Sequence, residues 1–417
     1  MNSPSTTIER PRVVAGIDWA LQTHVVCVLD VASGDVLDRF EITHDAAGLR
    51  RLVVRLGDQG VTRVGIERPD GPVVETLLEA GQRVCVIPPR TVKNLRSRHR
   101  GAGKDDRFDA YVLADAVRTD GHRLHDLTRD SPACRGLRAL VRARQDLVAA
   151  RVAATNQLRA TLEIHLPAAL GLFAALHSPI SRAFLREHPD QAAVDALDET
   201  TLGAWLRAHR YAGRTPVAVL LGRLRDAATG LNGDEADARR HVLLAQLAVV
   251  DTLEQQIAAL AEQIGATLES YADAKVFQSL PRAGVVRAAA LAAEIGDDRA
   301  RYPCPQTLAV AAGVAPVTHA SGKFTAVGFR YRVHTQLRRA LTELADDSRH
   351  ANPWAADVYA RARARGMRHP HAVRVLARAW CHVIWRCWRD DTPYDPARHG
   401  ALQQLQHAQQ SPVQLAA

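Results

Sequence analysis

Acidic residues appear abruptly after a purely basic segment near residue 104 of this chain. Three aspartates, Asp105, Asp106 and Asp109, follow a run from residue 90 to residue 104 in which every charged side chain is positive. A polyanion could lie along the basic run, but carboxylates repel phosphate unless a divalent cation sits between them. This arrangement predicts metal-dependent chemistry on a nucleic acid. The side chains predicted to contact nucleic acid are Arg90, Lys93, Arg96, Arg98, Arg100 and Lys104.

Two more acids, Asp18 and Glu67, each end a short apolar run typical of a buried strand. Such strands seldom carry a carboxylate without a partner. If the two strands are neighbours, both carboxylates converge at one end of the sheet, and Asp106 and Asp109 can approach from a covering helix. Taken singly, each acid also fits a structural role as turn acid, strand end or helix cap. Asp105 is an alternative to Asp106, because it lies four residues before Asp109.

Four carboxylates at one point favour bound cations. Two Mg²⁺ (or Mn²⁺) ions held by Asp18, Glu67, Asp106 and Asp109 could activate a nucleophile and stabilise the leaving oxygen of a phosphodiester. We therefore expect these four residues to be both metal ligands and catalytic residues.

An α/β domain is expected to position these acids. Residues 12–42 read as a three-stranded antiparallel meander, and strands then alternate with helices, which predicts a mixed α/β sheet. We place this domain at residues 12–128, after a disordered segment at residues 1–11. The later predicted elements are helices at 45–56 and 72–80 and strands at 63–67 and 83–87.

Helical patterns dominate the rest of the chain. Long helices at 132–165 and 236–271 could pair as an antiparallel coiled coil or dimerise between chains, and proline-separated short helices lie between them. Between residues 135 and 159 the first long helix carries six arginines against one acid, which favours a phosphate-facing side. We place this helical region at 129–271, an all-α domain at 272–395 with its tryptophans in the core, and a Gln-rich disordered tail at 396–417.

Composition narrows the class of protein. The 417 residues include 54 lysines and arginines against 45 aspartates and glutamates, a net charge of +9. This length predicts two or three domains, and the arginine excess favours a nucleic-acid partner, although a high-GC genome would also enrich arginine. Six scattered cysteines without zinc spacing fit a reducing cytosol. Without an apolar run of membrane-spanning length, we expect a cytoplasmic protein with no membrane partner.

The acidic motifs carry a resemblance to a known family. Gly-Ile-Asp18, Gly-Ile-Glu67 and Lys104-x-Asp106-x-x-Asp109-Ala110 resemble the DEDD transposases of bacterial insertion sequences, the insertion sequence one-ten family, whose N-terminal domain is RuvC-like with a ribonuclease H-type fold. Residues 276–345 resemble that family's C-terminal transposase domain. The motifs there are Ser279-Leu-Pro-Arg-Ala-Gly284, Ala292-Ala-Glu-Ile-Gly-Asp297, Leu308-Ala-Val-Ala-Ala-Gly-Val-Ala-Pro316, Ser321-Gly-Lys323 and Leu337-Arg338-Arg339-Ala340-Leu341.

The resemblance implies a transposase that cuts and rejoins DNA through a serine. Ser321 matches the family's nucleophilic serine, and a hydroxyl needs activation by a base or a metal. The resemblance also implies a composite site in a homo-oligomer (dimer or tetramer), and a structured RNA that bridges the element ends and the target DNA. We expect a bacterial, nucleoid-associated protein. The basic residues expected to line a phosphate channel near the serine are Lys323, Arg330, Arg332 and Arg338.

The segment Ser279–Gly296 also reads as a degenerate helix-hairpin-helix. Such a motif offers backbone amides and a helix N-terminus to phosphate. Arg282 stands where a glycine is usual, so a packed helix pair without a ligand is an equal alternative.

Three other functions are considered for this sequence. A RuvC-like junction nuclease would hydrolyse DNA with metal-bound water and leave Ser321 incidental, since a Ser-Gly pair alone is typical of a turn. An ATP-binding fold of the sugar-kinase and actin type would need Gly-rich phosphate loops, and the chain offers none that is convincing. A decayed, catalytically inactive relative would bind nucleic acid and keep the acids for structure.

Overall fold

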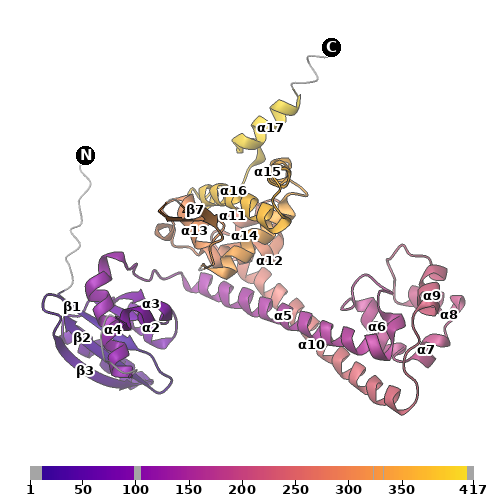
Figure 1. Cartoon of the computed structure of the whole chain (residues 1–417), viewed down its shortest axis with the longest axis horizontal. Helices are drawn as coiled ribbons and strands as arrows, with labels where there is room; N and C mark the ends of the chain where they lie inside the picture. Colours follow the sequence, from indigo (N-terminus) through magenta and orange to yellow (C-terminus); the bar gives the residue numbers. More distant parts are fainter. Residues whose placement is uncertain (1–11, 98–104, 323, 332, 411–417) are drawn as a thin grey trace. The chain divides into compact units, whose positions relative to one another are not determined.

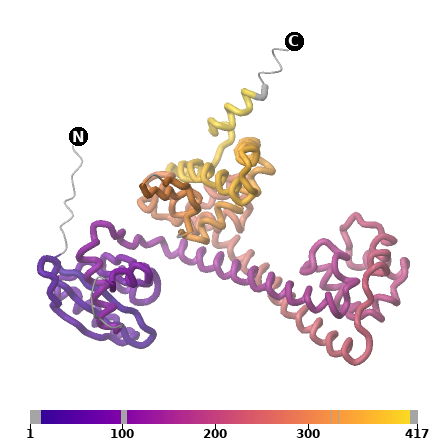
Figure 2. The backbone as a smooth tube through the Cα atoms, viewed as in Figure 1, coloured from indigo at the N-terminus to yellow at the C-terminus, as the bar shows by residue number. Residues whose placement is uncertain are grey.

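Two compact units make up the chain in this computed structural model, which describes residues 12–97, 105–322, 324–331 and 333–410. Unit 1 is Met1–Arg129 and unit 2 is Asp130–Ala417. The predicted boundary at 128/129 lies one residue away, and unit 2 takes in both predicted segments 129–271 and 272–395. Figure 1 labels the elements of each unit, and Figure 2 traces the backbone. Among the described helices, none combines the length and apolarity needed to cross a bilayer.

Unit 1 is built on a five-stranded sheet with the order β3-β2-β1-β4-β5. β2 runs antiparallel to β1 and β3, whereas β4 is parallel to both β1 and β5. This order, with β2 opposed to the other four strands, is that of the ribonuclease H-type fold. The mixed α/β sheet and its opening meander are therefore confirmed. The strands are β1 (Val13–Asp18), β2 (Thr23–Asp30), β3 (Val36–Thr43), β4 (Arg63–Ile66) and β5 (Arg83–Val86).

Helices cover both faces of this sheet because its strands are apolar on both faces. One face packs with α1 and α2 around Ile17 and Ile66. The other face packs with α4 around Val14 and Leu113, and α3 adds Val92 to this second core. The helices are α1 (Ala46–Asp58), α2 (Pro72–Glu79), α3 (Pro89–Arg96) and α4 (Asp106–Asp120).

Two glycines let α4 lie directly on the strands. A Cβ atom built on Gly16 would stand 2.2 Å from the carbonyl oxygen of Ala110 and 2.3 Å from the amide nitrogen of Ala114. A Cβ atom on Gly65 would stand 2.8 Å from the carbonyl oxygen of Leu113. Only a hydrogen fits at these positions, so the two glycines fix the depth of α4 on the sheet.

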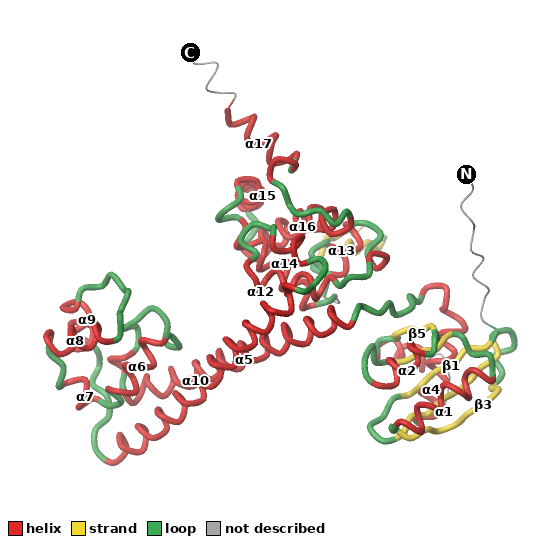
Figure 3. Tube along the Cα trace, turned by 180° about the vertical axis from the view of Figure 1, so that it is seen from behind, coloured by secondary structure: helices red, strands yellow, loops and turns green. Residues whose placement is uncertain are grey.

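A long helical hairpin forms the frame of unit 2. α5 (Pro132–His165) and α10 (Asp234–Glu269) pack side by side in Figure 3. They are antiparallel, because the start of α5 shares a core with the end of α10, and the end of α5 shares another with the start of α10. Coiled-coil packing along the pair stays a prediction.

Two arginines of α5, expected from the sequence to face phosphate, instead form ion pairs with acids on other helices. Arg142 donates two hydrogen bonds, from Nε and from one terminal nitrogen, to the carboxylate of Glu294 at 2.9 and 2.8 Å, and Glu294 is 2 % exposed. Arg151 pairs with Glu254 across the hairpin at 3.0 Å. The expected phosphate-facing role is therefore wrong for these two arginines, because acids on neighbouring helices, the buried Glu294 and the half-buried Glu254, form ion pairs with them.

The remaining helices form two cores on this frame. The first core lies around Phe184 at the far end of the hairpin, and the second includes the buried Trp380 and Trp388, as expected for core tryptophans. The helices of the first are α6 (Pro179–Glu187), α7 (Gln191–Asp195), α8 (Glu199–Ala208) and α9 (Val217–Asp226). Those of the second are α11 (Ala274–Gln278), α12 (Gly284–Ile295), α13 (Pro305–Ala311), α14 (Thr335–Ser348), α15 (Pro353–Ala364) and α16 (His369–Arg389).

Two predictions for the C-terminal part need correction. The domain is not all-α, because β6 (Val317–Ser321) and β7 (Phe324–Gly328) form an antiparallel hairpin. The run before Ser321 alternates too weakly in polarity for its strand to be recognised, and its residues are mostly exposed. The tail is not wholly irregular either, since α17 (Gly400–Gln410) is helical and Leu402 is buried. Residues 1–11 and 411–417, expected to be disordered, lie outside the described residues.

The glycine contacts give a stability prediction. Gly16→Ala should lower the free energy of unfolding by about 3 kcal/mol, because the new methyl group overlaps the backbone of α4. Gly57→Ala is the matched control: it places the same methyl group on α1 with no atom within 4 Å, and should raise stability by about 0.5 kcal/mol. Urea unfolding of both variants checks this, and equal effects would contradict the role given to Gly16.

Candidate active site

Asp18 and Glu67 lie at the same edge of the sheet. β1 ends at Asp18, β4 ends at Ile66, and Ile17 is in register with Ile66 across the parallel pair. Because side chains alternate along a strand, each acid shares a face with the glycine two residues before it. That is the face covered by α4. In each of the motifs Gly-Ile-Asp and Gly-Ile-Glu, the glycine therefore contacts α4 and the carboxylate lies beside the helix.

The first turn of α4 brings the other two acids to this edge. Asp106 and Asp109 are in the first turn, and Asp109 is 4 % exposed. Asp105 instead caps the helix, because its carboxylate accepts a hydrogen bond from the amide of Arg107 at 3.2 Å. This geometry favours Asp106 over Asp105 as the third ligand.

The charges of the neighbouring carboxylates change the pKa of Asp18. The pKa of Asp18 is raised from 3.8 to about 7, first by burial and then by the charges of Asp109, Asp106 and Glu67, while Arg96 opposes the shift. A carboxylate with three negative neighbours is destabilised in its charged form, as expected where a cation is to be held. The structure therefore brings together all four acids that the sequence singled out.

Arg96 has a place that the sequence did not predict. Its guanidinium pairs with one oxygen of Asp109, so in this structure it neutralises a carboxylate, whereas a nucleic-acid contact was expected. The other oxygen of Asp109, Oδ1, is buried and has no hydrogen-bond partner within the described part of the chain. Arg90 and Lys93 are exposed on α3, in keeping with the predicted contact surface. Arg98, Arg100 and Lys104 lie outside the described residues.

These residues fit a divalent cation. A buried carboxylate oxygen without a partner needs a positive ligand, and four carboxylates form the all-oxygen donor set that Mg²⁺ and Mn²⁺ prefer. Asp109 Oδ1 supplies the unpaired atom.

Two residues missed by the sequence analysis brace this edge. Trp19 and Arg68 directly follow the two strand-end acids, and the guanidinium lies over the indole ring with 4.3 Å to its centroid. The contact ties the ends of β1 and β4 together and contributes about 0.5–1 kcal/mol at such an exposed site. The sequence does contain a pattern that could have indicated this contact: an aromatic residue directly follows one strand-end acid, and a cationic residue directly follows the other.

Ser321 lies in unit 2, at the end of β6. Its side chain is exposed, and it pairs with Phe324 at the tip of the hairpin. Gly322 takes a φ of +57°, the left-handed conformation that a tight hairpin turn requires. The tip therefore presents a hydroxyl on a short, exposed turn.

Guanidiniums gather beyond β7. Those of Arg338 and Arg374 lie over the ring of Phe329, with 4.4 and 4.7 Å to its centroid. Arg338, predicted to contact phosphate, also donates to the carbonyl oxygens of Ala312 and Arg330, so much of its hydrogen-bonding capacity is used within the fold. The predicted Arg330 is half-buried, and Lys323 and Arg332 lie outside the described residues.

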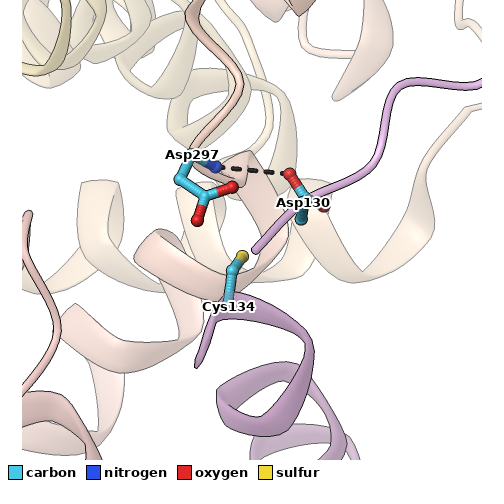
Figure 4. A group of neighbouring side chains, drawn as sticks. All are labelled: Asp130, Cys134 and Asp297. Carbon is cyan, nitrogen blue, oxygen red and sulfur yellow. Dashed lines mark hydrogen bonds between the residues drawn. The ribbon is translucent and has the colours of Figure 1, made fainter. Parts of the chain in front are cut away.

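A second acidic group resembles a metal site but is better explained as structure. Asp130, Cys134 and Asp297 place three ligand atoms within 4.8 Å of one another (Figure 4). Asp130 already pairs with Arg138 at 2.5 Å and Arg301 at 2.9 Å. Burial raises the pKa of Cys134 to about 11, so the thiol keeps its proton at neutral pH and is a poor ligand.

The hydrogen bonds of this group join two helices. The amide of Asp297 donates to Asp130 at 3.3 Å, and the carboxylate of Asp297 accepts from the amide of Ser131 at 3.1 Å. The group thus fixes the start of α5 to the end of α12. Among the described residues, this is the one group that brings three such ligand atoms so close together.

Comparisons with known proteins agree with both halves of the chain. Residues 15–167 match the family model DEDD_Tnp_IS110, described as a transposase, and residues 274–360 match a model described as Transposase IS116/IS110/IS902 family. Among solved structures, T. thermophilus RuvC in complex with Holliday junction substrate is similar at 17 % identity, covering 28 % of this chain and 99 % of that one, with a TM-score of 0.22.

Relatives match along nearly the whole length. The mini-circle putative transposase for IS117 of Streptomyces coelicolor is 32 % identical over 398 residues, covering 93 % of this chain and 96 % of that protein. The insertion element IS116 uncharacterized 44.8 kDa protein of Streptomyces clavuligerus is 29 % identical over 404 residues, with 93 % and 97 % covered. With both family models matched in order and a relative this similar from end to end, the chain belongs to the IS110 family of transposases.

Proposed function

We propose that this transposase cuts and rejoins DNA with a divalent-metal site formed by Asp18, Glu67, Asp106 and Asp109, and with Ser321 as nucleophile. The observation that carries the proposal is the convergence of the four carboxylates at one edge of the sheet. Burial, together with the charges of the three neighbouring acids, raises the pKa of Asp18 to about 7, and a buried oxygen of Asp109 has no partner in the described residues. Three acids raise the pKa of Asp18 and one base, Arg96, lowers it, so negative charge is in excess around this carboxylate and a cation would offset it.

The four carboxylates would hold one or two Mg²⁺ or Mn²⁺ ions. A cation held there supplies Lewis acidity, neutralising phosphate charge and stabilising the departing oxygen. Arg96 pairs with Asp109 in this structure, and a bound cation would take its place on that carboxylate. The guanidinium is then available for a phosphate, which would reconcile its present position with the predicted nucleic-acid contact.

Ser321 would attack the phosphorus of a phosphodiester. The hydroxyl oxygen forms a new bond to phosphorus as its proton leaves, and the bond to the displaced strand's oxygen breaks as that oxygen takes up a proton. The energy of the phosphodiester is kept in the link to serine, so a second strand can reverse the step and be joined. The exposed turn at Ser321 supports access by a duplex. The serine and the carboxylates belong to different units of the chain, and their joint action is part of the proposal.

DNA ends and target DNA are the proposed substrates, and the family resemblance adds a structured RNA and a homo-oligomer, dimeric or tetrameric. The net charge of +9 and the exposed Arg90 and Lys93 support a nucleic-acid partner. Base pairing with the RNA would select sequences while these cations contact backbones. We propose that the protein acts at the bacterial nucleoid, in the cytoplasm.

A metal-dependent junction nuclease is the second candidate. It is favoured by one observation: all four carboxylates belong to unit 1, so hydrolysis by activated water would not require Ser321. The two functions differ in whether a protein–DNA bond forms.

The metal site is tested by replacing its buried carboxylate. Asp109→Asn should lower Mg²⁺-dependent excision from a plasmid carrying the gene and its native flanking DNA by about three orders of magnitude, equal to about 4 kcal/mol of transition-state stabilisation. Asp105→Asn is the matched control, because asparagine also caps helices and should keep activity. Full activity of Asp109→Asn would reject the metal site, and loss in Asp105→Asn alone would reassign the ligand.

The nucleophile is tested by Ser321→Ala. We expect detergent-resistant protein–DNA adducts and strand exchange to disappear while DNA binding is retained, because only the attacking oxygen is removed. Thr318→Ala removes an exposed hydroxyl from the same hairpin and should leave both signals intact. Strand exchange by Ser321→Ala at the wild-type rate would favour the nuclease instead.

The raised pKa of Asp18 predicts a pH-dependent stability. Because the folded-state pKa of about 7 lies above the ordinary 3.8, the folded protein binds this proton more tightly, and stability is lost as pH rises from 3.8 towards 7. In EDTA, Asp18→Asn should therefore raise Tm by about 2–5 °C more at pH 8 than at pH 4. Asp35→Asn, in an exposed turn, is the control. An equal shift at both pH values would contradict the burial and crowding of Asp18.

A further inference from the structure

A cavity of about 470 Å³ lies in unit 2, between α5, the start of α12 and α14. Its wall is strongly basic, with a single carboxylate, Glu343, against four guanidiniums. These belong to Arg144, Arg282, Arg287 and Arg339.

The cavity wall carries more positive than negative charge. Two of the guanidiniums pair with acids of α14, Arg339 with Glu343 at 2.7 Å and Arg287 with Asp347 at 2.6 Å. Within the described residues, Arg144 and Arg282 form no ion pair. The cavity therefore holds two positive charges in excess, which an anion would neutralise.

The backbone at the mouth of α12 is shaped for an anion. Arg282 and Gly284 have φ values of +57° and +58°, and Ala283 between them is right-handed at −59°. Alternating handedness turns successive N–H groups towards one side, which can form an anion-binding concavity. The amide of Ala283 is already used, because it donates to the carbonyl oxygen of Leu280 at 3.1 Å, so the concavity would be formed by the amides that follow it. α12 begins at Gly284 without a side-chain cap, so its first amides, which border the cavity, are left for another acceptor.

A buried amide independently indicates a missing ligand. Gln145 lines the cavity, is more than nine-tenths buried, and its Oε1 has no hydrogen-bond partner in the part of the chain that the structure describes. The Nε atom of Arg144 is buried and unpartnered as well. Burying such groups is unfavourable unless something in the cavity bonds to them. Since the two ends of an amide can exchange by rotation, Gln145 can donate to an anion as well as accept.

We propose that this cavity binds one phosphodiester group of a nucleic-acid backbone, held by Arg144, Arg282, Gln145 and the first amides of α12. The inference rests on the proposed function and adds a second anchoring point to it, separate from the carboxylates and from Ser321. Arg282 stands where a helix-hairpin-helix usually has glycine. Its left-handed backbone keeps the tight turn that glycine would give, and its side chain adds a charge. DNA and RNA carry the same phosphodiester, so both are tested.

The test uses the full chain in EDTA, with fluorescence anisotropy of a labelled 30-base-pair DNA duplex and a labelled 30-nucleotide RNA as probes. Arg282→Gly should weaken binding about tenfold without lowering Tm, since glycine relieves the left-handed backbone. Arg210→Gly is the matched control, the same substitution at another exposed left-handed arginine (φ +50°), and should leave affinity unchanged. Adding Arg144→Ala should lower the slope of log affinity against log salt by about 0.9 for DNA or about 0.7 for RNA.

The results with the DNA and RNA probes together identify the ligand of the cavity. A loss confined to one probe assigns the cavity to that nucleic acid, and a loss on both supports a shared site. Unchanged affinity and slope for both probes in the double variant, with Tm preserved, would overturn the proposal. Because binding is measured without metal, this failure is distinct from a failure of the catalytic site, which Asp109→Asn reports through excision.

Discussion

The close approach of α4 to β1 is the constraint on which the rest of the candidate site depends. Without side chains at Gly16 and Gly65, the helix lies directly on the strand backbones, and its first turn then has to stand beside the ends of β1 and β4. The acids are consequently confined to one edge of the sheet, where their charges oppose one another. This confinement disfavours four charged carboxylates without a cation, and it would contribute to the binding energy of the proposed metal ion.

Much of unit 1 could be predicted from the sequence because its motifs carry both packing and chemistry. Each Gly-Ile-acid motif combines a strand end, a glycine against which the helix packs and a carboxylate. The convergence of Asp18 and Glu67 was predicted on the condition that the two strands are neighbours, and the pairing of β1 with β4 meets that condition. The pairing of Arg96 with Asp109 could not be predicted, because it depends on the packing of α3 beside α4. A basic run looks the same in sequence whether its side chains face solvent or a neighbouring acid.

Unit 2 shows the same limit more strongly. Its arginines divide between structural and free roles according to whether an acid from another helix reaches them: Arg142 meets the buried Glu294, whereas Arg144, two residues on, meets none in the described chain and borders a cavity. Around Ser321 the sequence indicates a turn but not the two flanking strands, because these strands are short and mostly exposed. Local composition predicted helices well here and predicted the partners of charged groups poorly.

Direct observation of a cation is the measurement that tests the central claim most sharply. Crystals of the full chain soaked in Mn²⁺ should show anomalous density between Asp18 and Asp109, with Arg96 displaced from the carboxylate and Asp109 Oδ1 among the ligands. Anomalous density absent from this edge at saturating Mn²⁺, with the Arg96–Asp109 pair intact, would contradict a metal site formed by the four carboxylates.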